Sequence, residues 1–197
     1  MLKFLTRLFE RRAEPRWRTS QALADFEAIF GDGGLSSGVT VTPERALTIP
    51  AVFACVQVLS QDVARTPLKL RRRVGEGAYE DAVDHDLFEL LHDLPNPEQT
   101  AYGFKAALML SQLTYGRAYA EIVRREGRVV ALWPLDARMM RVDREPGTRR
   151  KRWTYAAGGQ TMTWLFDPST PPVFELVHET PIARCRELIG IALALQR

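Results

Sequence analysis

The chain has 197 residues, 46% of them hydrophobic, which is enough for one domain of ordinary size with a buried core. Its charged fraction of 26% and formal net charge of +3 are average for a globular protein, so charge alone does not indicate nucleic-acid binding. The two cysteines, Cys55 and Cys185, lie among apolar residues of predicted helices, where we expect reduced thiols packed as small core side chains. This cysteine usage predicts an intracellular, reducing environment.

Residues 1–38 are predicted to form an amphipathic N-terminal arm followed by a flexible linker. Leu2, Leu5 and Leu8 recur at helical spacing, and basic residues occupy the other faces. The arm is too short to span a bilayer and lacks the continuous apolar core and cleavage site of a secretory signal. We expect it to lie on a membrane surface, to dock on a partner subunit or to pack locally. Glycine and serine dominate residues 31–38, as in linkers.

The second unit, residues 39–197, is predicted to be one α+β domain in which helices pack on a mainly antiparallel sheet of hairpins. N-cap and helix-ending residues outline three helices before residue 117. In chain order, the predicted cap and end residues of these helices are Thr48 and Pro67, Asp84 and Pro95, and Thr100 and Gly116. Apolar side chains at helical and strand spacing then define the expected core: Val52, Phe53, Val56, Leu59, Phe104, Leu108, Ile122, Leu132 and Trp133.

Strand patterns dominate the second half of the domain. Alternating residues on both sides of Glu126 and Gly127 predict a hairpin. Further strands are expected at residues 135–142, 153–155, 161–166 and 173–177. A closing helix is predicted to begin with Thr180 as N-cap and Pro181 at its first position. Its apolar face predicts that it completes the core of its own domain or packs on a downstream segment or a neighbouring subunit.

Two clusters of basic residues are candidates for contacts with DNA, scaffold or capsid. The first is Arg71, Arg72 and Arg73, and the second is Arg149, Arg150, Lys151 and Arg152, followed by Trp153. Cations that meet phosphates and an aromatic ring that stacks on bases would make the second cluster a nucleic-acid-binding module, which is the alternative function. The competing interpretation is a solvated hairpin tip, because Pro146 and Gly147 predict an exposed turn.

Enzymatic function is the weakest of the classes considered. The sequence contains no nucleophile-elbow, zinc-protease, P-loop or dinucleotide-binding motif. His85 and His92 lie seven residues apart with aspartates nearby, but polar residues at a helix start are usually caps or solvated side chains. We therefore expect no catalytic residue, no metal site and no cofactor.

Five short motifs, in a fixed order, resemble those of the portal, or head-to-tail connector, proteins of long-tailed bacteriophages. They are A-V-x-A-C-V at residues 51–56, P-L-x-L-x at 67–71, L-L-x-x-x-P-N-P at 90–97, G-x-A-Y-x-x-I at 116–122 and L-W-P-L-x at 132–136. Each motif is weak alone, whereas their shared order is hard to reach by chance. The chain departs from the family pattern between Val177 and Thr180, where family members usually carry a longer glycine-containing loop.

The resemblance implies a structural virion protein. Its implied partners are further copies of itself in a dodecameric ring at one capsid vertex, the major capsid or scaffold protein, the terminase motor, the neck or adaptor protein, and double-stranded DNA in the tunnel, with no membrane. The ring would be assembled in the host bacterial cytoplasm, in a phage, a prophage or a gene transfer agent. Family members are longer, so we expect a wing portion truncated before the stem and clip.

Overall fold

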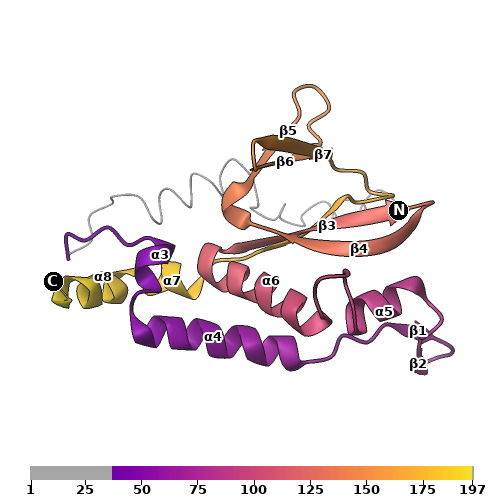
Figure 1. The fold of residues 1–197 in the computed structure, drawn as a ribbon, viewed down its shortest axis with the longest axis horizontal. Helices are drawn as coiled ribbons and strands as arrows, with labels where there is room; N and C mark the ends of the chain where they lie inside the picture. The colour runs from indigo at the N-terminus through magenta and orange to yellow at the C-terminus, as the bar shows by residue number, and fades with distance from the viewer. Residues whose placement is uncertain (1–36, 197) are drawn as a thin grey trace, which may run out of the picture.

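The computed structural model describes residues 37–196, and nearly all of the predicted N-terminal arm lies outside this range. Its helices and strands form the mixed helical and antiparallel arrangement that the sequence predicts. Helices α4, α5 and α6 lie on one side of a three-stranded sheet, and a second three-stranded sheet lies on the other side (Figure 1). The expected sheet of hairpins is thus divided into separate sheets.

The first helices are α3 (Pro43–Ala46) and α4 (Pro50–Arg65). The predicted cap of the long helix, Thr48, is wrong: Ile49 holds the N-cap position without a side-chain bond, and the Thr48 hydroxyl donates to the Arg45 carbonyl at 2.7 Å. The reason is the extra helix α3, which occupies the preceding residues and is capped by Thr42. The predicted end before Pro67 is confirmed.

Helix α4 packs against α6 (Ala101–Tyr115) through its small residues. Val56, Ser60 and Ala64 are its buried side chains, which lets the two helix axes approach closely. Phe53 and Leu59 were predicted to lie in the core, but the structure leaves them 49% and 48% exposed. The prediction was wrong because α4 carries apolar residues on more than one face, and the close approach to α6 selects the face with the smaller side chains.

Helix α5 (Asp86–His92) and helix α6 are joined by a turn that is hydrogen-bonded to Leu132 of the sheet. His85, not Asp84, caps α5, because its Nδ1 accepts a hydrogen bond from the Leu87 N–H at 3.1 Å. Asn96 is buried in the turn, and its side chain donates to the Leu132 carbonyl at 2.8 Å. The caps of α6 are confirmed: Thr100 accepts from a backbone N–H at the start, and Gly116 ends the helix with φ +75°.

The main sheet has the strand order β4-β3-β8. Strands β3 (Arg117–Arg125) and β4 (Arg128–Leu135) form the predicted hairpin, with positive φ at both turn residues, and β8 (Val173–Val177) coincides with the last predicted strand. Phe104 and Leu108 of α6 cover the face that carries Ala118, Ala120 and Leu132. Tyr119 has the opposite parity and therefore faces the second sheet.

The second sheet has the order β5-β6-β7, with β5 at Met140–Arg144, β6 at Lys151–Ala157 and β7 at Gln160–Leu165. Part of the strand predicted at residues 135–142 is instead a 3-10 turn, Ala137–Met139, which carries the chain from one sheet to the other. Trp153 and Val142 of this sheet form a core cluster with Tyr119 and Val173 of the main sheet. A third, two-stranded sheet joins β1 (Arg71–Arg73) and β2 (Tyr79–Asp81).

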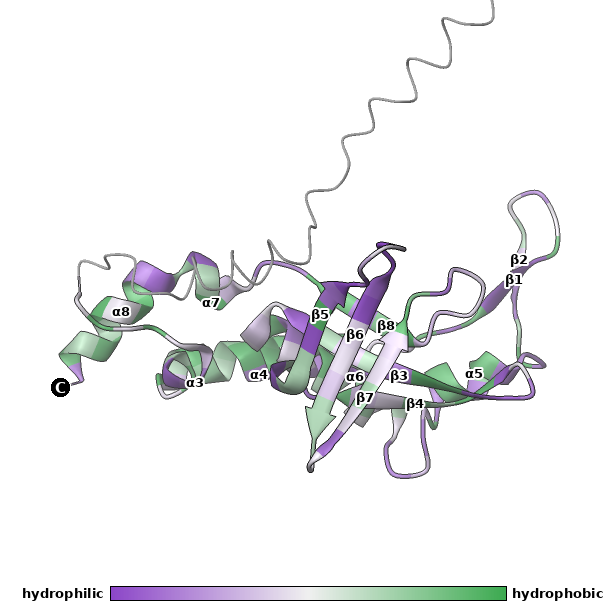
Figure 2. Ribbon diagram, turned by 90° about the horizontal axis from the view of Figure 1, so that it is seen from above, coloured by the Kyte–Doolittle hydropathy of each residue, from purple (hydrophilic) through white to green (hydrophobic). Residues whose placement is uncertain are grey.

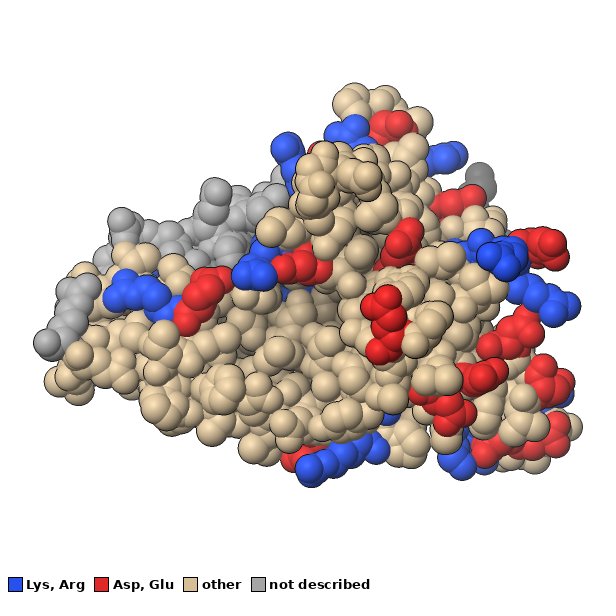
Figure 3. Space-filling view, viewed as in Figure 1, with Lys and Arg blue, Asp and Glu red and all other residues tan. Residues whose placement is uncertain are grey.

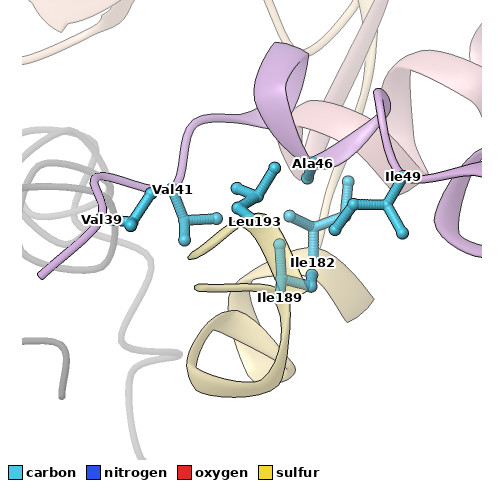
Figure 4. Packing of buried hydrophobic residues seen from close by; sticks show 7 residues of the cluster. All are labelled: Val39, Val41, Ala46, Ile49, Ile182, Ile189 and Leu193. Carbon is cyan, nitrogen blue, oxygen red and sulfur yellow. The ribbon is translucent and has the colours of Figure 1, made fainter. Parts of the chain in front are cut away.

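The closing segment forms two helices, α7 (Pro181–Arg184) and α8 (Arg186–Leu195), and not one. Thr180 caps α7 as predicted, and the helix is interrupted at Cys185. Figure 4 shows Ile182, Ile189 and Leu193 pointing toward the segment that leads into α4. One face of the closing segment therefore completes the core of its own domain. The opposite face stays bare, since Leu188 is 70% and Leu195 83% exposed.

Candidate interaction surfaces

The arginines of β1 lie on an exposed hairpin whose charge is balanced. The Arg72 guanidinium donates to both carboxylate oxygens of Asp84, at 2.8 and 2.9 Å. This hydrogen bond is the main reason why the pKa of Asp84 lies below its usual value and that of Arg72 above it. Arg71 lies 3.6 Å from an Asp81 oxygen, and Arg73 donates to the Gly75 carbonyl at 3.1 Å.

Residues 69–84 contain four basic and four acidic side chains, so their net charge is zero. Figure 3 shows basic and acidic groups interleaved at the end of the molecule that carries this hairpin. A duplex is held chiefly through its phosphates, which favour a surface with excess positive charge. This hairpin is therefore better suited to a protein partner than to DNA.

The second basic cluster is divided between a loop and a strand. Arg149 and Arg150 belong to the exposed loop between β5 and β6, and Arg149 adopts a positive φ of 56°. The backbone carbonyls of the loop are held in place: the Arg144 guanidinium of β5 donates to the Arg149 carbonyl at 2.9 Å, and the Glu145 N–H donates to the Arg150 carbonyl at 2.9 Å. The guanidinium groups of Arg149 and Arg150 are thus presented to solvent on a defined loop.

Trp153 is only 2% exposed and forms part of the core between the two sheets. Its indole N–H donates to Glu175 of β8 at 2.6 Å, and the Lys151 ammonium both pairs with Glu175 and lies 5.3 Å from the centre of the Trp153 ring. Trp153 consequently offers no face for a base to stack on. Contact between this cluster and nucleic acid would have to rest on the loop arginines.

Glu175 connects strands that are distant in the sequence. It accepts hydrogen bonds from two β6 side chains while its own strand pairs with β3, where it lies opposite Tyr119. Burial raises the pKa of Tyr119 to about 12, so its phenol is neutral at the sheet contact. The arrangement fixes the second sheet on the first and serves packing.

Arg152 points to the other side of β6 and pairs with Asp143 of β5, at 2.8 and 3.0 Å. The hydrogen bond from Arg152 lowers the pKa of Asp143, and burial of the carboxylate opposes this effect. A carboxylate with a depressed pKa in the folded state contributes stability above its unfolded pKa, and that stability is lost as the pH falls through the folded value.

Replacing Arg152 by glutamine is therefore expected to reduce the acid sensitivity of the fold. Urea unfolding midpoints at about pH 7 and about pH 3 should differ less for Arg152→Gln than for the unaltered chain. Arg141→Gln is the matched control, because Arg141 lies 3.6 Å from the same carboxylate and is more exposed. Equal acid sensitivity in all three proteins would show that the Arg152 pair is immaterial to stability.

The apolar face of α8 was expected from the sequence to need a partner, whereas the exposed apolar face of α4 was not recognised as a surface. Figure 2 shows both helices as largely hydrophobic, although much of their surface faces outward. The signal that could have found the α4 surface is its small-residue spacing, Val56, Ser60 and Ala64, which marks the inward side. The two cysteines are also on these helical segments, and both are exposed, so the expectation that they pack in the core is wrong.

His85 and His92 interact with residues close to them in the sequence. His85 is a helix cap, and His92 contacts Asp93 at 2.8 Å and stacks on Phe88. Within residues 37–196, no three His, Cys, Asp or Glu side chains are placed to hold a metal ion. No helix in the same range is both long and apolar enough to cross a lipid bilayer.

Comparison with known proteins identifies the class to which this architecture corresponds. Residues 50–197 match the family of phage portal proteins, so the chain belongs to that family. This confirms the resemblance carried by the five motifs. Portal proteins are structural proteins and are not known as enzymes.

One relative is a protein of Streptomyces phage phiC31 described as a "probable portal protein". It is 32% identical over 190 residues, which cover 86% of this chain and 40% of the relative. The chain thus spans less than half the length of that relative.

Solved structures of gene transfer agent particles share the fold. A chain in the neck of an empty particle with C6 symmetry matches 75% of this chain and 41% of its own length, at 19% identity and a TM-score of 0.63. A chain in the neck of a native particle with C12 symmetry matches 92% of this chain and 44% of its own length, at 17% identity and a TM-score of 0.58. The α+β fold class predicted from the sequence is therefore confirmed.

Proposed function

We propose that the chain is a structural component of a virion or gene transfer agent particle and acts in a portal ring at one capsid vertex. The observation that carries this proposal is the family match over residues 50–197, and the shared fold of the neck chains supports it. Copies of the chain associate as a homo-oligomer, dodecameric in the complete family member. The domain described here corresponds to the wing part of such a subunit.

The partners follow from that position. Double-stranded DNA passes through the ring during packaging and ejection, and the terminase motor and the neck or adaptor protein dock on the ring. The major capsid or scaffold protein surrounds the ring, which is assembled in the host bacterial cytoplasm. The balanced charges of the β1–β2 hairpin favour a protein partner at that end of the molecule.

Gold labelling of particles tests the proposal directly. A peptide tag is inserted in the exposed β1–β2 turn, residues 74–78, and the tagged chain is produced in a host that makes the particles. We expect gold at a single vertex of each labelled particle. Label spread over the whole capsid, or absence of the chain from purified particles, would contradict the proposal.

The loop arginines are proposed to contact DNA, scaffold or capsid. Changing Arg149 and Arg150 together to glutamate should leave the unfolding midpoint unchanged, because both residues are exposed, and should lower incorporation into particles several-fold. If the contact is to DNA phosphates, the slope of log affinity against log salt concentration should fall by about 2.

The matched control for this double change is Arg125→Glu with Arg128→Glu, which alters the tip of the β3–β4 hairpin by the same charge. Incorporation of the Arg149 and Arg150 variant at the level of the unaltered chain would remove their assigned role. A fall of equal size in both variants would show only a general charge effect.

A further inference from the structure

Two helices present apolar side chains that no part of the described chain covers. The α4 face consists of Cys55, Val58, Leu59 and Val63, which lie on one side of the helix. The α8 face consists of Leu188, Ile191 and Leu195, spaced three and four residues apart. All seven residues are exposed, and in each helix another face already packs inside the domain.

Long segments of both helices contain no charged side chain. The twelve residues from Pro50 to Gln61 and the nine from Leu188 to Gln196 contain no acidic or basic side chain. In Figure 3, the surface over α4 and α8 is a broad area without charged groups. Ion pairs stand at its borders, Asp62 with Arg65 at 3.2 Å and Glu179 with Arg184 at 2.6 Å. An apolar centre with a polar rim is the usual anatomy of a protein interface.

The size of the two faces also indicates a partner. Single exposed apolar side chains are ordinary, whereas a contiguous patch of roughly 300–600 Å² is the largest that a typical monomer shows and is often functional. The α4 face exposes four such side chains and the α8 face exposes three, which is more than the scattered single residues of an ordinary surface. Covering both faces would supply much of the roughly 1,200 Å² or more that a stable interface buries.

The occupant that fits both faces is a second copy of the chain. The outer side of α8 points away from its own domain, because Ile189 and Leu193 on the inner side pack on Val39 and Val41. It therefore cannot reach α4 of the same molecule, but it can reach α4 of a neighbour. Pairing α4 with α4 about a two-fold axis would leave α8 bare, whereas an α8-to-α4 contact covers one face of each kind and repeats from copy to copy.

We propose that the α8 face of one copy packs against the α4 face of the next copy in a head-to-tail contact. This inference rests on the proposed ring, because a head-to-tail contact with a suitable rotation closes into one. It deepens that proposal by assigning the subunit contact to two particular helix faces, with side chains three and four residues apart packing as ridges into grooves.

Charge introduced on either face should break the contact without unfolding the domain. Leu188→Glu with Leu195→Glu removes the α8 face, and Leu59→Glu with Val63→Glu removes the α4 face. All four positions are exposed and helical, and glutamate is a good helix former. The control is Val83→Glu, another exposed apolar residue, which lies outside both faces.

Native mass measurement under reducing conditions provides the readout. We expect assemblies larger than a dimer for the unaltered chain and for Val83→Glu, and monomers for each double variant. An equimolar mixture of the two double variants should form a one-to-one heterodimer and nothing larger, because one intact α8 face then meets one intact α4 face. A two-fold contact would not be restored by mixing.

The remaining outcomes separate the two proposals. Double variants that still assemble like the unaltered chain, or a mixture that stays monomeric, would overturn the α8-to-α4 contact and leave the ring to other surfaces. An unaltered chain that stays monomeric at its highest soluble concentration would also overturn the contact. The proposed function would fail separately, if gold-labelled particles lacked the label at a single vertex.

Discussion

Replacing Trp153 by alanine is expected to lower the free energy of unfolding by about 3–5 kcal/mol. The indole is buried between the two three-stranded sheets, so its removal leaves a cavity at their contact. It also removes a hydrogen bond to Glu175, whose other side-chain donor within residues 37–196 is Lys151. Urea unfolding followed by circular dichroism measures the loss.

Two further variants separate the effect of the lost ring volume from the effect of the lost hydrogen bond. Trp164 lies opposite Trp153 in the register of β6 and β7 but is only partly buried, so Trp164→Ala should cost clearly less. Trp153→Phe keeps most of the ring volume and removes the N–H, so its cost should be roughly 1.5–3 kcal/mol, the range of a hydrogen bond to a charged group. If Trp153→Ala cost no more than Trp164→Ala, the sheet contact would not depend on this side chain.

The second large effect is expected at Gly116, where alanine should destabilise the fold by roughly 2–4 kcal/mol. Gly116 ends α6 with φ +75°, which is strained for any other residue. A Cβ atom there would lie 2.7 Å from the His178 carbonyl oxygen and 3.0 Å from Cγ2 of Thr180. The His178 N–H also donates to the Gly116 carbonyl at 2.8 Å, so the two backbones cannot separate without losing that bond.

Gly127 provides a matched control for Gly116. Its φ is +81°, but a Cβ atom built there meets no atom within 4 Å. Gly127→Ala should therefore cost about 1 kcal/mol, the dihedral strain alone. The difference between the two urea midpoints measures the close approach of the α6 end to the segment after β8. Equal losses at both glycines would show that this approach contributes nothing.

Sequence reasoning succeeded where local chemistry decides the structure. Thr100 and Thr180 cap helices because their hydroxyls reach a backbone N–H three residues ahead, and this needs no distant partner. Gly116 was expected at a helix end for the same local reason. The β3–β4 hairpin followed from alternation around a turn in which both residues have positive φ.

The failures concern contacts between distant segments. Leu59 was expected inside and lies outside, because periodicity shows that α4 has apolar stripes but not which stripe α6 will meet. Asp84 was expected to cap α5, but it is engaged by Arg72, twelve residues earlier. Trp153 was grouped with the basic residues beside it, while its real partner, Glu175, is 22 residues away. Such pairings depend on the topology of the fold and not on the residues adjacent in the sequence.

Because Cys55 and Cys185 are exposed, the reaction of their thiols can report which surfaces of the domain are covered. Cys55 lies on the outer side of α4, and Cys185 lies at the junction between α7 and α8. An alkylating reagent added to dilute protein should modify both sulfurs, and shielding of Cys55 in higher-order species would report that α4 has been covered. Air oxidation would cross-link molecules through the same sulfurs, so an apparent oligomer observed without reductant can be a preparation artefact.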